Sequence, residues 1–264
     1  MKNIKLISLN LAIKKDNTEK VINFLLEQNA DIVCLQEVCD HKEESVGEVF
    51  RVKQKIDDAL GSKYPHRHFA PLFMTKSFSV FDFGGYIEQG NYILSKFPIL
   101  HSSNDFFHRQ YYKVKDWAKE INFKVLDSGR SLQTVTLDMD ATPLRVMNIH
   151  GVWTADKMGD ERTINECNFI IEKFAEEDMP TILAGDLNLL PDSEGIKILN
   201  KKLENLILEN SYKSTRPDFK DEIDEGNNIV DYIFINDNLK PNNFQVLDVA
   251  VSDHLPLVCE FEIN

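Results

Sequence analysis

The stretch TILAGDLN at 181–188 constrains this chain most, because it joins a buried strand directly to a pair of polar side chains. Its first four residues are small or apolar and predict a buried strand. Gly185 then breaks the strand and lets the backbone pass close to a neighbour. Asp186 and Asn188 follow two residues apart, so an extended chain would point both the same way. Their oxygens suit a hard cation or a phosphate, and the alternative is a plain turn.

The same arrangement, an apolar strand that ends in or is followed by a polar side chain, recurs along the chain. The other residues in such positions are Asn10, Glu37, His150, Asp231, Asp253 and His254. Burying a carboxylate in apolar surroundings is costly unless it is paired or bound to metal. Any one of these residues taken singly reads as a hydrogen-bonded core group. Their repetition favours one shared site at a rim where strand ends converge.

Charge limits the size of the partner that the chain can bind. The 264 residues include 30 basic and 43 acidic side chains, which gives a formal charge of −13. Binding along a nucleic-acid backbone rests on a basic stripe, and only loose clusters such as Lys113, Lys115 and Lys119 are present. Extended nucleic acid is therefore disfavoured as a partner. A cation held in an acidic site can still present positive charge to one phosphate, so the charge limits the size of the substrate more than its chemistry.

Composition places the chain among globular proteins with a proper core. Hydrophobic residues make up 42% of the sequence, with no linker or composition shift, so we predict one domain over 1–264. The longest apolar runs are strand-sized, and we expect neither a membrane span nor a signal peptide. The four cysteines are scattered, and Cys34 and Cys259 lie in strand patterns that suggest core residues. We therefore expect a reducing, cytoplasmic location. The oligomeric state is not indicated.

Hydrophobic periodicity predicts short strands mixed with helices. The predicted strands are 4–11, 31–35, 90–95, 131–138, 144–150, 181–184, 229–236, 244–249 and 257–261. The predicted helices follow 16–19 and cover 43–60, 160–177 and 193–199. The segment 106–129 reads as irregular. Because strands and helices do not strictly alternate, we predict an α/β (α+β) fold with two stacked mixed sheets flanked by helices.

The residue types suit metal-assisted hydrolysis of a phosphoester. Glu37 and Asp253, with Asn10, offer hard oxygens to Mg²⁺ or Mn²⁺. His254 is a candidate acid or base that Asp231 could orient through a carboxylate–imidazole hydrogen bond. A metal with a base-activated water is one mechanism of phosphoester hydrolysis. The sequence carries no P-loop, nucleophile elbow or zinc-protease motif that would indicate a competing scheme.

Seven short motifs resemble, in order, those of the endonuclease/exonuclease/phosphatase superfamily. They are SLN at 8–10, LQEV at 35–38, ILSKFP at 93–98, NIH at 148–150, GDLN at 185–188, VDYIF at 230–234 and SDHLPL at 252–257. That superfamily includes deoxyribonuclease I, exonuclease III, inositol polyphosphate 5-phosphatases and neutral sphingomyelinases. Each motif is weak alone, but seven in order are specific for the superfamily. They do not identify the subfamily.

The resemblance implies a four-layer sandwich and assigns a role to each polar position. Glu37 would be the main metal ligand, assisted by Asn10 and Asp253. Asp186 and Asn188 would position the attacking water, the phosphate or a second ion. His254 would pair with Asp231, and His150 would contact the phosphate.

The motifs do not identify the residues that recognise the substrate. Two aromatic stretches, 78–86 and 106–112, could form a lip that holds a base, a ring or an acyl chain, or could fill the core. Tyr92 stands where the superfamily often has a small residue, and it would either intrude on the pocket or pack in the core. Three arginines are candidate phosphate clamps by residue type, with ordinary surface positions as the alternative: Arg109, Arg130 and Arg216.

We predict a divalent-metal-dependent phosphoesterase in which water attacks phosphorus without a covalent intermediate. A phosphodiesterase acting on a small or chain-end substrate is the first interpretation. The alternatives are a phosphomonoesterase acting on a phosphorylated small molecule or lipid headgroup, and a DNA or RNA nuclease. A binding module that had kept the fold and lost catalysis would show a gap among the polar positions, and the sequence shows none.

Overall fold

The computed structural model describes residues 3–12, 17–78, 81–114, 128–140, 142–216 and 228–264. A seven-stranded mixed sheet runs in the order β12 (Leu239–Val246), β13 (Leu257–Ile263), β1 (Ile4–Asn10), β2 (Ile32–His41), β4 (Phe81–Ser95), β3 (His66–Phe78) and β6 (Tyr112–Lys113). A six-stranded mixed sheet runs in the order β10 (Glu204–Asn205), β11 (Asp231–Ile235), β9 (Thr181–Asp186), β8 (Leu144–His150), β7 (Arg130–Leu137) and β5 (Ile99–His108). Within the described ranges, no helix is long and apolar enough to cross a membrane.

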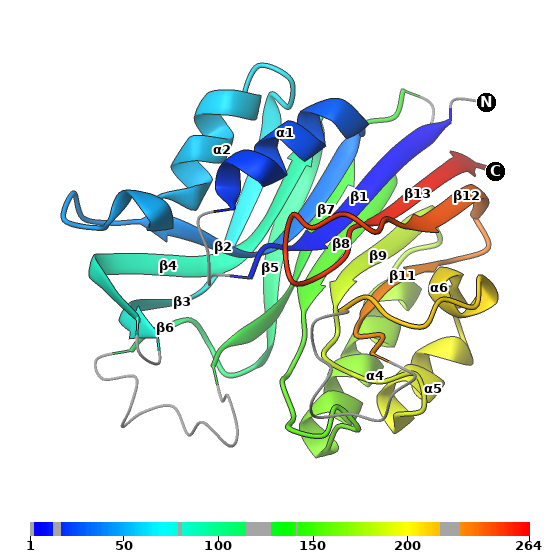
Figure 1. Ribbon diagram of the computed structural model, residues 1–264. Coiled ribbons are helices and arrows are strands. Elements are labelled where there is room, and N and C mark those ends of the chain that lie inside the picture. The colour runs from blue at the N-terminus through cyan, green and yellow to red at the C-terminus, as the bar shows by residue number, and fades with distance from the viewer. Residues whose placement is uncertain (1–2, 13–16, 79–80, 115–127, 141, 217–227) are drawn as a thin grey trace.

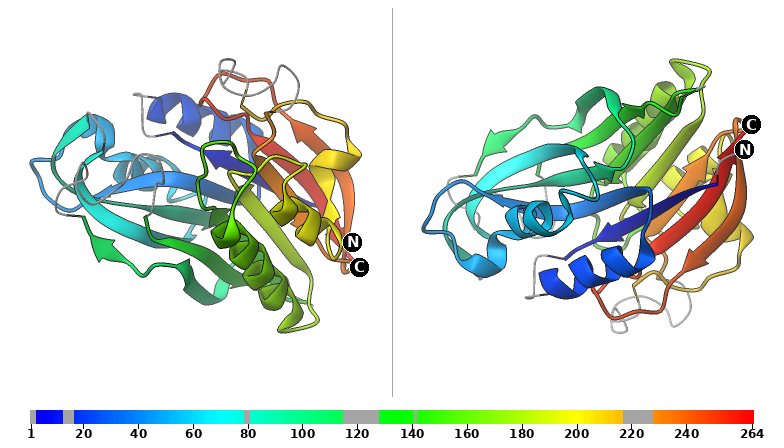
Figure 2. Two further views of the ribbon diagram at one scale, coloured as in Figure 1. Left: turned by 90° about the horizontal axis from the view of Figure 1, so that it is seen from below. Right: turned by 90° about the horizontal axis from the view of Figure 1, so that it is seen from above.

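The two sheets stack face to face, and helices cover their outer faces (Figures 1 and 2). The seven-stranded sheet carries α1 (Thr18–Gln28) and α2 (Val52–Leu60). The six-stranded sheet carries α4 (Glu161–Ala175) and α5 (Glu194–Asn200), with the short α6 (Leu206–Glu209) beside β11. Apolar side chains from both inner faces form one large core, and a second cluster lies under α1 and α2. The predicted four-layer sandwich of two mixed sheets is confirmed.

Two predicted helices differ from the structure. The predicted helix 43–60 is wrong over its first half, where a single 3-10 turn (Glu48–Phe50) precedes α2. Two backbone groups there bond to β4 instead of continuing a helix, because Lys42 N donates to Tyr86 O and Gly47 N donates to Phe83 O. In α1, the helical pattern that starts with Val21 and Ile22 would also turn Leu26 inward, but Leu26 is 40% exposed and Phe24 is buried in its place.

The aromatic stretches divide between core and surface. Phe83 is buried against Phe50 at 4.7 Å between ring centroids, and Phe107 packs on Phe169 at 5.8 Å. Tyr86 lies under the ammonium group of Lys113. The core alternative therefore holds for Phe83, whereas Phe107 is only partly buried against the core. The side chains of Phe78 and Phe81 lie outside the described part.

Tyr92 packs away from the gap between the sheets. Its ring meets Phe69 at 5.9 Å in the cluster beneath α1 and α2, and its hydroxyl donates to the carboxylate of Asp57 on α2. Asp57 also accepts from Lys53 and Arg67. Of the two alternatives for this tyrosine, packing in the core is the one that the structure shows.

A chain of side-chain amides links the two sheets across the middle of the sandwich. Gln36 on β2 donates to the side-chain oxygen of Asn148 on β8 at 2.7 Å. Asn148 in turn donates to the side-chain oxygen of Gln133 on β7 at 2.9 Å, and Gln133 donates to the backbone oxygen of His68 on β3 at 2.7 Å. Each of these three amides is buried, so their partners satisfy groups that water cannot reach.

Glu166 on α4 is a fully buried carboxyl group behind the end of β8. Its Oε2 accepts the N–H of Val152 at 2.9 Å. Burial raises the pKa of Glu166 to about 8, although the Val152 N–H and the charge of Arg130 act in the opposite direction. The folded protein thus keeps this proton at pH values where the unfolded chain has lost it.

We expect the stability of the protein to fall as pH rises from about 4.5 to 8, and Glu166→Gln to remove part of this dependence. A raised folded-state pKa contributes stability that is complete below the unfolded pKa and is lost as pH rises through the folded pKa. One pKa unit corresponds to about 1.4 kcal/mol, so the effect is of the order of a few kcal/mol. Urea unfolding at pH 5 and pH 8 measures it, with the exposed Glu161→Gln as control. Parallel pH curves for Glu166→Gln and the unmodified protein would contradict the expectation.

Candidate functional site

Three polar side chains stand next to one another at one edge of the six-stranded sheet. His150 ends β8, Asp186 ends β9, and Asp231 begins β11. The registers pair His150 with Asp186 and Asp186 with Asp231. A Cβ placed on Gly185 would lie 2.1 Å from the carbonyl oxygen of Ile149, so this glycine permits close approach, as predicted, although the strand continues through it.

The seven-stranded sheet contributes Asn10 and Glu37. Asn10 ends β1, and its Nδ2 donates to Glu37 Oε1 at 3.3 Å and to Asp186 Oδ2 at 3.0 Å, which joins the two sheets. Glu37 follows Gln36 directly, and in a regular strand the two would point to opposite faces. The β2–β4 ladder shifts register here and Glu37 has a φ of 57°, so this bulge turns its side chain toward the site.

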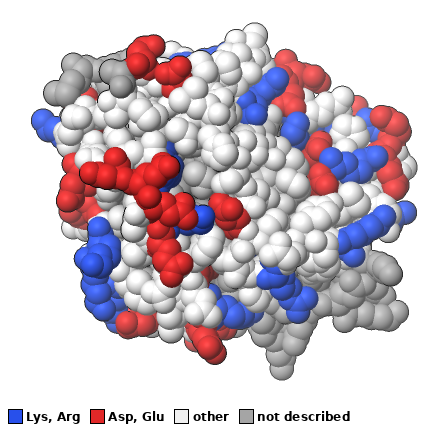
Figure 3. All heavy atoms as spheres, turned by 180° about the vertical axis from the view of Figure 1, so that it is seen from behind, with Lys and Arg blue, Asp and Glu red and all other residues white. Residues whose placement is uncertain are grey.

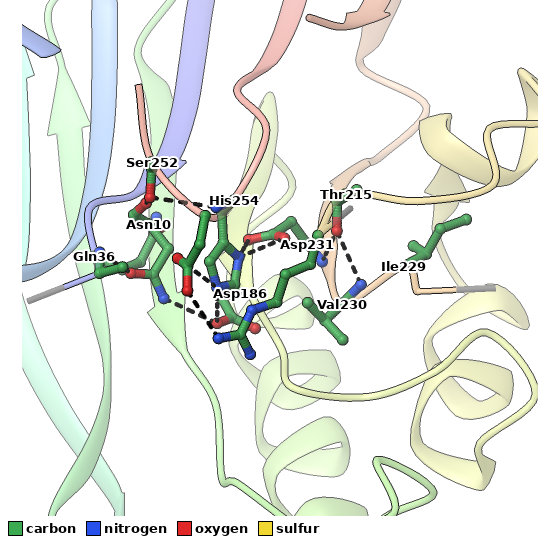
Figure 4. Close-up of polar contacts among 12 residues, drawn as sticks. Asn10, Gln36, Asp186, Thr215, Ile229, Val230, Asp231, Ser252 and His254 are labelled. Carbon is green, nitrogen blue, oxygen red and sulfur yellow. Dashed lines mark hydrogen bonds and ion pairs between the residues drawn. The ribbon is translucent and has the colours of Figure 1, made fainter. Parts of the chain in front are cut away.

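His254 and Asp231 form a buried pair. His254 Nδ1 lies 2.9 Å from Asp231 Oδ2 and 3.1 Å from Oδ1 (Figure 4). Thr215 supports the carboxylate segment by accepting the N–H of Asp231 at 3.2 Å. The other ring nitrogen, Nε2, lies 3.9 Å from Asp186 Oδ2 and 3.9 Å from Asp253 Oδ1. Asp231 therefore fixes the ring, and Nε2 faces the carboxylates.

The two histidines of the site differ in charge. Burial alone would lower the pKa of His254, but the charge and hydrogen bond of Asp231, with Asp186 and Asp253, raise it to about 9. Burial and the nearby Arg130 guanidinium hold the pKa of His150 well below its ordinary value. At neutral pH, His254 is therefore an imidazolium and His150 a neutral imidazole that lies 3.8 Å from Glu37 Oε1.

Asn188 lies in a turn and not in an extended strand, so the predicted reason for its proximity to Asp186 is wrong. The strand ends at Asp186, and Asn188 has a φ of 55°. Its N–H donates to Asp186 Oδ1 at 2.8 Å, a local turn that asparagine adopts readily. The turn and the polar site, treated above as alternatives, are both present, because the turn is what holds the two side chains together.

Lys157, which the sequence did not single out, is buried at the back of the site. Its side chain is 2% exposed, and its Nζ donates to Asn188 Oδ1 at 2.6 Å. Burial lowers the pKa of Lys157 to about 7, although the charge of Asp186 acts in the opposite direction. A lysine in a loop reads as a surface residue in a single sequence, and only the fold shows that this one is buried.

The three candidate arginines occupy different positions. Arg216 Nη2 pairs with Asp253 Oδ2 at 3.0 Å at the front of the site. Arg130 is buried behind the site and donates to the backbone oxygen of His150 at 3.4 Å. Arg109 is exposed in the turn after β5. Arg216 and Arg130 thus remain candidates for phosphate contact, and Arg109 lies at the surface.

The comparisons with known proteins agree with this geometry. The model of the endonuclease/exonuclease/phosphatase family matches residues 7–254, which is most of the chain. The chain belongs to this family. A search of curated proteins finds no significant match. Members of the endonuclease/exonuclease/phosphatase family are generally phosphoester hydrolases and typically use divalent metals.

Solved structures of the family share the fold at low sequence identity. An endonuclease/exonuclease/phosphatase from Beutenbergia cavernae gives a TM-score of 0.78 at 15% identity, with 100% of this chain and 72% of that chain covered. One from Bacteroides vulgatus gives 0.72 at 16% identity, with 100% of both chains covered. TDP2 from D. rerio, solved as a complex with a single-strand DNA product, gives 0.67 at 16% identity, with 99% of this chain and 100% of that chain covered.

The donor set of this family member fits a hard divalent cation. Carboxylates of Glu37, Asp186 and Asp253 converge on the rim, and ligand atoms of Asp186, Asp231 and His254 lie within 4.8 Å of one another. Asn10 Oδ1 accepts the N–H of Ala12 at 3.0 Å, so its nitrogen faces the carboxylates. Asn10 would offer its oxygen to an ion only after its amide turns over.

Proposed function

We propose that this chain is a divalent-metal-dependent phosphodiesterase, with residues 1–264 forming one domain, and that it acts on a small or chain-end substrate. The observation that carries the proposal is the meeting of Glu37 from one sheet with Asp186 and Asp231 from the other, where His254, from the loop before β13, pairs with Asp231. Such a set supplies both an anionic cation site and a proton-transferring group within one rim. The four buried free thiols suit the reducing, cytoplasmic location that we also propose.

Glu37, with Asp253 and Asn10, would hold Mg²⁺ or Mn²⁺ in this proposal. A bound cation polarises a phosphoryl oxygen and offsets the charge that develops on it. The neutral imidazole of His150 can donate an N–H to a phosphoryl oxygen without repelling the cation. Arg216, which is paired with Asp253, is positioned to contact a phosphate that enters from the front.

The His254–Asp231 pair would move the proton. Asp231 accepts a hydrogen bond from Nδ1–H and leaves Nε2 directed at the centre of the site. The imidazolium can give its Nε2 proton to the leaving oxygen, and the neutral imidazole that remains can take a proton from water. Asp186 and Asn188 would place the attacking water and the phosphate. The cysteines lie in the core with raised pKa values, which favours direct attack by water over a thiol-bound intermediate.

Two alternative activities are each supported by a specific observation. A phosphomonoesterase would gain from the buried cations Arg130 and Lys157, which lie near Asp186 and could offset a doubly charged phosphate. A nuclease is favoured by the structural similarity to D. rerio TDP2, whose structure contains a single-strand DNA product. We place both below a small phosphodiester, because the net charge of −13 opposes a long polyanion.

A substrate panel tests the proposal directly. Small phosphodiesters, phosphomonoesters, single-stranded DNA and duplex DNA are incubated with Mg²⁺ or Mn²⁺, with and without chelator. We expect chelator-sensitive turnover that is fastest on the small diesters and is lost in His254→Ala. Turnover that survives chelator, or that is equal in His254→Ala, would show that the activity does not arise from this site. Faster monoester cleavage would favour the first alternative.

Salt dependence is expected to be shallow. On the face drawn in Figure 3, lysines and arginines are scattered among acidic groups and form no continuous stripe. A protein that neutralises several phosphates of duplex DNA loses about 0.9 log units of affinity per phosphate for each tenfold rise in salt. We expect a slope of about one or two for any nucleic acid that binds, measured across a salt series. Efficient cutting of long duplex DNA with a steep slope would contradict this expectation.

A further inference from the structure

Lys157 is held in an unusual position for a lysine. Its backbone is fixed in the loop between β8 and α4, where its N–H donates to Thr154 O and its carbonyl accepts the N–H of Leu190. Its φ is 58°, a region that non-glycine residues seldom occupy. The side chain passes the ring of Trp153 at 4.8 Å and is almost fully buried. Burying an ammonium is costly, and strained positions of this kind concentrate at functional sites.

The partner of this ammonium is an amide of the site and not a carboxylate. Among the described residues, no acidic oxygen lies within 4.0 Å of Lys157 Nζ, whereas Asn188 Oδ1 lies at 2.6 Å. An ammonium can only donate hydrogen bonds, so it can face only the oxygen end of the carboxamide. Lys157 thereby settles which end of Asn188 is the oxygen. The nitrogen end makes one long contact, 3.4 Å to Gly151 O, and has a second N–H to offer.

We propose that Lys157 is a positioning residue, which holds Asn188 by its oxygen so that an amide N–H, and not the oxygen, is presented to the reacting phosphate. This rests on the proposed phosphoester chemistry and deepens it. Of the roles open to Asn188, donation to the phosphate is then selected over binding of a second ion. In its protonated form, Lys157 also adds a positive charge near Asp186, which opposes a second cation on that side.

The first experiment counts metal ions and needs no turnover. Mn²⁺ binding to the unmodified protein, Asn188→Ala and Asn188→Asp is measured by calorimetry and electron paramagnetic resonance. A carboxylate cannot donate, but it is a better ligand than an amide. We expect Asn188→Asp to bind no additional Mn²⁺ and to lose turnover as far as Asn188→Ala, by about 10²- to 10³-fold. An additional Mn²⁺ in Asn188→Asp, or activity restored by Mn²⁺, would show that Asn188 is a metal ligand and would overturn the proposal.

The second experiment asks whether Lys157 acts through Asn188. Lys157→Met keeps most of the length of the side chain and removes the cost of burying an ammonium, and a thermal melt shows whether the variant is folded. We expect its kcat to fall about 10- to 100-fold with KM nearly unchanged, as for loss of an orienting partner. The double variant with Asn188→Ala should be no slower than Asn188→Ala alone. If the two losses of kcat instead multiply in the double variant, Lys157 does not act through Asn188. The exposed Lys197→Met is the matched control.

The two experiments also separate this proposal from the proposed function. An unmodified protein that cleaves none of the phosphoesters would remove the proposed function. The Mn²⁺ count in Asn188→Asp would still decide whether Lys157 keeps the asparagine oxygen away from a cation. A folded Lys157→Met with normal kcat on an active substrate would overturn the positioning role and leave the proposed function standing.

Discussion

Replacing Glu37 by glutamine is expected to lower turnover about a thousand-fold or more while the protein stays folded. The change keeps the shape of the side chain and removes the negative charge that would hold a cation. The left-handed backbone at this position tolerates glutamine as well as glutamate, so the bulge in β2 should persist. Turnover with Mg²⁺ and Mn²⁺, together with a thermal melt, measures both parts of the expectation.

The control for this variant is Glu27→Gln on the exposed side of α1, which should behave as the unmodified protein does. A metal titration distinguishes loss of the cation from loss of the fold, because Glu37→Gln should need more Mn²⁺ to reach its residual rate. Near-normal turnover of Glu37→Gln at low metal concentration would remove Glu37 as the principal ligand.

The second large effect is expected from His254→Ala, with kcat lowered by about 10²- to 10⁴-fold and substrate binding nearly unchanged. The imidazole is proposed to act in the chemical step, and loss of a general acid or base has effects of this size. Asp231→Asn should act by the same route. A carboxamide has one oxygen and no charge, so it cannot accept from Nδ1–H with two oxygens or stabilise an imidazolium. Steady-state kinetics of both variants on one substrate give the comparison.

The double variant decides whether His254 and Asp231 act as a unit. Their atoms are in hydrogen-bond contact, so the effects of the two changes should not add, and the double variant should resemble His254→Ala. Simple multiplication of the two losses would refute the pairing. Thr215→Val perturbs the pair more weakly. It would remove the hydroxyl that accepts the N–H of Asp231 and leave the His254–Asp231 pair itself in place.

Asn10, His150 and Asp186 could be predicted because each ends a strand, and strand ends have a fixed place in a sheet. Asp231 begins a strand instead, and Glu37 lies at a bulge inside β2. The register of β8, β9 and β11 then brings His150, Asp186 and Asp231 together, as their positions in the sequence indicated. The four-layer arrangement could be predicted because the motifs resemble those of a family with that fold.

Other features depend on tertiary contacts that one sequence does not contain. The segment 42–47 has a helical pattern, yet it pairs with β4, which competes for its backbone hydrogen bonds. The strands β3 and β5 were not predicted because they are long and partly exposed, without the alternation of shorter strands. Lys157 was missed for a similar reason, since burial of a lysine is decided by the loops around it.

The amide chain from Gln36 through Asn148 to Gln133 ties the two sheets together behind the proposed site. Neither sheet alone carries a usable centre, because Glu37 and Asn10 arrive on one and Asp186 on the other. These hydrogen bonds form in the observed alignment of the sheets, so a slide of one sheet over the other would break them and leave buried amides without partners. During folding, the proposed site can therefore form only once the two halves have docked in that alignment.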